Sequence, residues 1–82
     1  MSLGADLQTK LSKKYEPSSM VHLTFHGKDL AVQTDREGNP VILFIGKFTP
    51  EGRIKGQRYA RTLKSDSQGR VIKDHWDLKG KV

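Results

Sequence analysis

Three histidines and nine acidic residues are the side chains of this 82-residue chain that could support acid–base chemistry. His22 and His26 fall on the same side of a predicted strand. They lie roughly 13 Å apart at 3.3 Å per residue, too far to share one metal ion. His75 has Asp74 and Asp77 as near neighbours, in a pattern that is typical of an exposed charge pair. Neither group predicts a catalytic dyad or a metal site.

Other catalytic and cofactor motifs are also missing from the sequence. The chain contains no cysteine, which excludes disulfides, thiolate zinc sites and a cysteine nucleophile. Its glycines do not follow the G-x-x-x-x-G-K-[ST] spacing of a phosphate-binding loop. We therefore predict a binding protein and not an enzyme, with no metal and no cofactor.

The positive charge is concentrated in the last part of the chain. Nine basic and three acidic residues lie from Arg53 onward, so this part carries the whole net charge of +6. Such an asymmetry predicts an anionic partner, although many small domains carry a basic surface for solubility alone. No apolar run approaches the roughly 18 to 20 residues of a membrane span. With no cysteine and no secretory pattern in the first residues, we expect a cytoplasmic location.

Five residues combine the aromatic and basic character that single-stranded nucleic acid requires: Phe44, Lys55, Tyr59, Arg61 and Lys73. We predict that a base stacks on Tyr59 beside Phe44, while the three basic side chains contact phosphates. A second interpretation stays open. The apolar part of the same surface could instead bind an acidic protein or a second copy of the chain as a weak homodimer.

One helix is predicted near the start of the chain, at about residues 3–15. Leu3, Leu7, Leu11 and Tyr15 recur at every fourth position and form an amphipathic stripe. Pro17 is expected to end the helix, because the residue before a proline avoids the α region.

Five strands are predicted in the rest of the chain, over about residues 20–79. Short apolar–polar alternations are separated by four turn signals, which is typical of an antiparallel β-meander. The predicted fold is mainly β, at the margin of α+β: one domain spanning residues 1–82, with a strongly twisted or barrel-like five-stranded sheet and one short N-terminal helix.

The turns also predict a register for the sheet. A two-residue turn at Gly27-Lys28, a centred loop at 35–40, a turn at 49–52 and a centred loop at 64–69 give these pairs: Leu23 with Val32, Val32 with Leu43, Ile42 with Tyr59, and Arg58 with Trp76.

This register divides the side chains between two faces. The predicted core face carries Val21, Leu23, Phe25, Leu30, Val32, Val41, Leu43, Ile45, Ile54, Ala60, Ile72, Trp76 and Leu78. The second face carries His22, Thr24, Gln33, Ile42, Phe44, Phe48, Lys55, Gln57, Tyr59, Arg61, Lys73 and His75. Either the sheet closes around the core face with the helix as a lid, or the helix lies across the core face and leaves the second face open.

Overall fold

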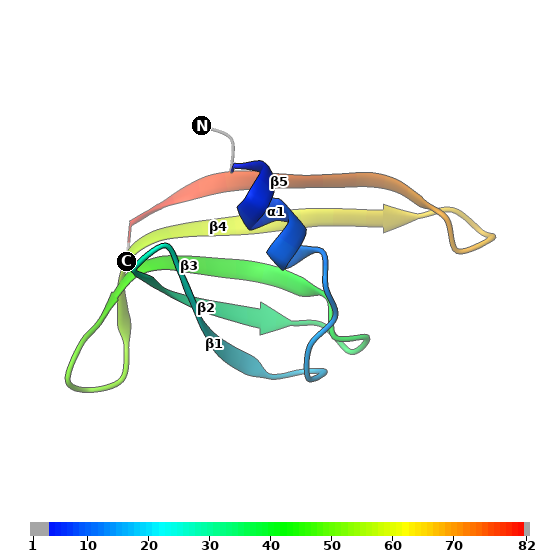
Figure 1. Cartoon of the computed structure of the whole chain (residues 1–82). Helices are drawn as coiled ribbons and strands as arrows, with labels where there is room; N and C mark the ends of the chain where they lie inside the picture. The colour runs from blue at the N-terminus through cyan, green and yellow to red at the C-terminus, as the bar shows by residue number, and fades with distance from the viewer. Residues whose placement is uncertain (1–3, 82) are drawn as a thin grey trace.

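The computed structural model describes residues 4–81 and contains one antiparallel sheet of five strands with one short helix (Figure 1). The elements in chain order are α1 (Ala5–Leu11), β1 (Met20–Phe25), β2 (Lys28–Thr34), β3 (Pro40–Phe48), β4 (Ile54–Ser65) and β5 (Val71–Lys81). Each strand pairs with its neighbours in sequence, so the sheet order is β1-β2-β3-β4-β5. The predicted meander is confirmed. The sheet is open, because β1 and β5 form its two edges.

The helix packs against one side of the sheet, which we call the covered face. Leu7 and Leu11 are buried there against four strand residues, namely Leu30, Val32, Leu43 and Tyr59. Figure 1 shows α1 lying across this side. Of the two predicted arrangements, the helix therefore lies across the core. The opposite side, which we call the open face, carries no helix formed by residues 4–81.

The helix is shorter than the predicted 3–15. It ends at Leu11, where the Ser12 hydroxyl donates a hydrogen bond to the Gln8 carbonyl. Tyr15 lies beyond the end because its backbone N–H donates to the Gly38 carbonyl at 2.9 Å, which holds this segment against a loop. Leu3 lies outside the described residues. The hydrogen bond between Tyr15 and Gly38, and not Pro17, therefore explains why the helix ends early.

The turn of the first hairpin lies one residue earlier than predicted, which shifts the pairing of β1 with β2 by two residues. Phe25 pairs with Lys28, so the turn consists of His26 and Gly27, with φ of 50° and 78°. Two residues with positive φ are typical of a type I′ turn. Leu23 consequently pairs with Leu30 and not with Val32. The shift is an even number of residues, so every side chain of β1 keeps its predicted face.

The loops 35–39, 49–53 and 66–70 share one geometry. In each, the N–H of the first residue donates to the carbonyl of the fifth, and the N–H of the fourth donates to the carbonyl of the first. The fourth residue is a glycine with φ of 83° or 84°: Gly38, Gly52 and Gly69. This is a three-residue hairpin loop, made of a type I turn followed by a residue in the left-handed conformation. Compared with a two-residue turn, the glycine is one extra residue, and it shifts the pairing register of the next strand by one.

That extra residue overturns the predicted register between β3 and β4. Because Gly52 is the added residue, Thr49 faces Arg53, Leu43 pairs with Tyr59, and Ile42 pairs with Ala60. The prediction had Ile42 opposite Tyr59. A shift of one residue exchanges the faces of a whole strand. Ile54 and Ala60 therefore lie on the open face, whereas Tyr59 and Arg61 lie on the covered face.

The last strand differs from its predicted register by three residues, because Thr62 pairs with His75 and not with Ile72. This second odd shift cancels the first, so Trp76 keeps its predicted place and packs against the core. Ile72 and Leu78 were predicted in the core, but they are 66% and 42% exposed. Both lie next to register shifts of the β4–β5 pair, on the edge strand of the sheet.

Candidate binding site on the open face

A row of four side chains crosses the open face from β1 to β4. His22 pairs with Ala31, Ala31 with Phe44, and Phe44 with Arg58. Directly opposite residues of antiparallel strands point to the same side of the sheet. The row therefore places a small side chain, Ala31, between two rings, and a guanidinium group beside the second ring.

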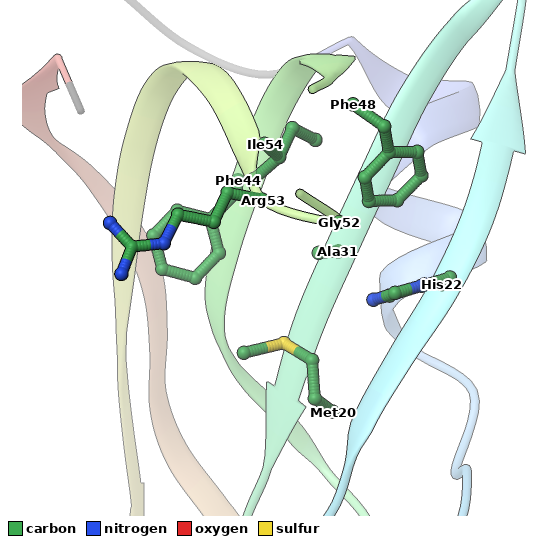
Figure 2. Close-up of a pocket in the computed structure, with 8 residues that line it drawn as sticks. All are labelled: Met20, His22, Ala31, Phe44, Phe48, Gly52, Arg53 and Ile54. Atoms are coloured by element: carbon green, nitrogen blue, oxygen red, sulfur yellow. The ribbon is translucent and has the colours of Figure 1, made fainter. Parts of the chain in front are cut away.

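The small side chain leaves a hollow in this face. Its volume is about 300 Å³, and Figure 2 shows the side chains around it: Met20, His22, Ala31, Phe44, Phe48, Gly52, Arg53 and Ile54. Ala31 forms the floor and is 3% exposed because the larger neighbours surround it. Most of the lining is apolar, and the charged group on its rim is Arg53.

The β3–β4 hairpin bends to supply one wall of the hollow. Gly46 pairs with Gly56 where the two backbones come unusually close. A Cβ on Gly46 would collide with the Lys55 carbonyl, and a Cβ on Gly56 would collide with the Ile45 carbonyl. Beyond this glycine pair, Phe48 and Ile54 reach the hollow.

Two contacts hold that wall in place. The carboxylate of Asp29 on β2 accepts a hydrogen bond from the Phe48 N–H at 3.0 Å, which ties the end of β3 to its neighbour. The rings of His22 and Phe48 lie 4.6 Å apart between centroids at an interplanar angle of 44°. The aromatic wall is therefore formed before any ligand arrives.

Basic side chains extend from the hollow along the open face. Arg58 lies opposite Phe44, and Lys64 lies on the same side of β4, roughly 20 Å further along at 3.3 Å per residue. Lys64 pairs with Lys73 of β5, and both are exposed. The Asp77 carboxylate on this side pairs with His75 at 2.8 Å.

Tyr59, predicted to stack on a base, lies in the core. It is 2% exposed, packs with the buried leucines and valine of the covered face, and donates its hydroxyl to Gln57 Oε1 at 3.3 Å. Its predicted position on the second face is wrong, because the glycine of the 49–53 loop reverses the faces of β4.

Arg61 is also internal, with a side chain that is 7% exposed. Its Nε and Nη2 donate to the Asp74 carboxylate at 2.6 and 2.7 Å, and its Nη1 donates to the carbonyls of Leu11 and Pro40. Its guanidinium carbon lies 5.6 Å from the Trp76 ring centroid. Arg61 thus joins the helix end, β3 and β5, and its donors are not available to phosphates.

The contact with Arg61 also changes the pKa of the Asp74 carboxyl group. The hydrogen bonds and charge of Arg61 lower the pKa of Asp74 below its usual value, against an opposing effect of partial burial.

The other three predicted residues are accessible but separate. Phe44 lines the hollow. Lys55 is exposed in the outer part of the β3–β4 hairpin, opposite Lys47 and outside the hollow. Lys73 lies on the edge strand. The structure therefore does not bring the five predicted residues together into one site.

Residues absent from the predicted set complete the hollow. Phe48 belongs to the aromatic side chains predicted on the second face but not to the five predicted site residues. His22 is predicted on that face without a binding role, and neither Arg53 nor Ala31 is among the predicted site residues. The T-P-E-G-R sequence of the 49–53 loop is the signal that could have found Arg53. A type I turn followed by a glycine predicts the bulged loop, and the bulge turns Ile54 and Arg58 to the side of Phe44.

Comparison with protein-family models, with curated proteins and with solved structures finds no match for this chain. Within residues 4–81, no three His, Asp or Glu side chains gather as a metal ion would require. No helix in that part of the chain has both the length and the apolar composition of a membrane span.

Proposed function

We propose that this protein is a small basic module that binds single-stranded nucleic acid on its open face. A base enters the hollow beside Phe44 and Phe48, and phosphates contact Arg53, Arg58 and Lys64. The row His22–Ala31–Phe44–Arg58 carries the proposal, since it sets a ring-sized recess beside a cation on a face that α1 leaves uncovered. With no cysteine in the chain, we expect the protein to act in the cytoplasm.

Stacking and charge each support this proposal. A base that stacks on an aromatic side chain contributes about 1 to 3 kcal/mol, and any base can do so because each has a π-face. Basic side chains beside the stacking site neutralise phosphates and release counterions. The module therefore favours single strands, whose bases are free to leave the stack, with little preference for sequence.

A second candidate is an apolar anchor from a protein partner. The apolar lining of the hollow and the 49% exposure of Met20 at its edge favour this alternative. The two candidates differ in their salt dependence, because phosphate contacts weaken steeply as salt rises and apolar contacts do not.

Fluorescence anisotropy with labelled single-stranded and duplex oligonucleotides tests the proposal. If Arg53, Arg58 and Lys64 neutralise about three phosphates, log affinity for the single strand should fall with log salt at a slope of about −2. Phe44→Ala should weaken binding about tenfold and leave that slope unchanged. Arg58→Gln should make the slope shallower by about 0.7.

Two further variants serve as matched tests. Ala31→Leu fills the floor of the hollow without changing charge, so it should weaken binding as much as Phe44→Ala does. Lys55→Gln removes a positive charge outside the hollow and should leave affinity and slope close to those of the parent. No binding at low salt, or equal effects of Lys55→Gln and Arg58→Gln, would leave the protein-anchor alternative.

A further inference from the structure

The last strand, β5, has an exposed edge with unusual apolar exposure. It spans eleven residues, Val71–Lys81, and no strand within residues 4–81 pairs with its outer side. Val71, Ile72 and Leu78 are 58%, 66% and 42% exposed. Unpaired backbone groups on a sheet edge are a template for pairing with another strand.

We propose that two copies of this chain pair through β5, antiparallel, about a two-fold axis at His75. The proposal does not depend on the nucleic-acid site. A two-fold axis perpendicular to a sheet sets one residue opposite its own copy, because directly opposite residues must point to the same side. The axis must therefore pass through a residue of β5, and the charges on the strand decide which one.

The axis is sought near the middle of β5, in the part of the strand that is most regular. This part is regular against β4 from Lys73 to Leu78, with register shifts on both sides. The candidate axes near its middle are Asp74, His75 and Trp76. An axis at Asp74 sets that carboxylate opposite its own copy. An axis at Trp76 sets Lys73 opposite Lys79. Both place like charges directly opposite each other, which is destabilising.

The axis at His75 makes the edge complementary to itself. It sets Lys73 opposite Asp77 of the second copy, and this pair occurs twice by symmetry. It also sets Ile72 opposite Leu78 of the second copy, so two exposed apolar side chains meet on each side of the axis. Charged residues on an edge strand ordinarily prevent pairing with another strand. Here the opposite charges favour pairing with a second copy in this one register.

Pairing at β5 leaves the open face accessible. In the dimer Lys73 faces a carboxylate, so Lys64 supplies the positive charge for phosphate at this end of the face. Phe44 lies on β3, two strands away from β5, and Arg53 lies in the loop that joins β3 to β4. Dimer formation and binding in the hollow are therefore separately measurable.

Cross-linking through single cysteines tests the register, since the parent chain contains none. In His75→Cys, the two thiols would lie opposite each other, with Cα atoms about 4.5 to 5.5 Å apart, within the span of a disulfide. We expect rapid conversion to a disulfide-linked dimer under mild oxidation. The control Lys73→Cys puts its two thiols about 13 Å apart and should stay largely unlinked. Equal rates for the two variants, or no link in His75→Cys, would overturn the proposal.

A charge exchange tests the contact by sedimentation velocity over a range of concentrations. Lys73→Asp and Asp77→Lys should each reduce dimer formation at least tenfold, because each sets like charges opposite one another twice. The double variant restores opposite charges and should restore the dimer. Lys79→Asp makes the same change of charge as Lys73→Asp. Because Lys79 lies opposite the uncharged Val71 of the second copy, it should reduce dimer formation much less. A parent chain that stays monomeric throughout, or a double variant no better than the singles, would overturn the proposal.

Discussion

The two faces of this sheet reverse the usual relation between residue type and role. The covered face contains the polar side chains of Arg61, Asp74 and Tyr59. Arg61 joins β4 to Asp74 of β5 and to the end of α1, and Tyr59 packs in the core. The open face contains Phe44 and Phe48, which line a hollow and support no helix. Burial and partners, and not the chemical type of a side chain, therefore indicate which residues are available to a ligand.

The two arginines of β4 show the same contrast. Arg61 is nearly buried and has four acceptor contacts, on Asp74, Leu11 and Pro40. Arg58, three residues earlier, lies on the other side of the strand, opposite Phe44. Arg61 therefore joins parts of the fold, whereas Arg58 lies on the open face, where the proposed ligand would bind.

The largest effect is expected from the neighbouring residues Leu43 and Phe44, which point to opposite faces of β3. Leu43 is 0% exposed in the core, so Leu43→Ala should lower the free energy of unfolding by about 2 to 5 kcal/mol. Thermal melts followed by the fluorescence of Trp76 would measure it. Phe44→Ala is the matched control and should lower stability much less while it reduces oligonucleotide binding. Equal losses of stability would mean that the two faces do not differ as described.

An intermediate effect is expected from Arg61→Met, which keeps much of the side-chain volume. It leaves the Asp74 carboxylate and two backbone carbonyls without their donor, and should cost about 2 to 3 kcal/mol of stability. The salt slope of oligonucleotide binding should not change, in contrast to Arg58→Gln. A shallower slope with unchanged stability would place Arg61 in the binding site and reverse the comparison.

The smallest effect is expected on the loss of folding stability as the pH is lowered. Arg61 lowers the pKa of Asp74, so this carboxylate stabilises the folded state fully above its unfolded pKa of about 3.9. That contribution is lost as the pH falls through the lower folded value. Melts between pH 5 and pH 2 should show a shallower loss of stability in Asp74→Asn than in the parent.

Some acid sensitivity should remain in Asp74→Asn. Burial by itself would raise the pKa of Asp35, but hydrogen bonds from Asn39 and Glu37 outweigh it and lower that pKa. Asp35 therefore still titrates below its usual range in the variant. A parent and variant with identical pH profiles would show that the Arg61–Asp74 contact adds nothing to stability.

The predictions from sequence were accurate for the number and order of the strands and for the pairing of β2 with β3. Alternation of apolar and polar residues identified five strands, and Val32 pairs with Leu43 as expected. Leu30, Val32 and Leu43 were correctly placed on the core face, where all three are buried. Trp76 also reached the core, but through two odd shifts of register that cancelled.

The candidate site was predicted less well, because it depends on the parity of β4. Of the five residues chosen, Tyr59 and Arg61 lie on the covered face, and Phe44 lines the hollow. One glycine, Gly52, decides this outcome, since its left-handed conformation adds a residue to the loop. Side chains alternate with a period of two, so one added residue is enough to reverse every side chain of the strand.

The sequence by itself determined the number of strands, their order and the apolar stripe of the helix. These follow from local propensity, turn residues and short connections, which leave a meander as the simplest topology. The tertiary structure decided where the helix ends, which face it covers, and which basic and aromatic side chains remain free. Those properties depend on contacts between segments far apart in the chain, such as Arg61 with Leu11 and Tyr15 with Gly38, and no local pattern encodes them.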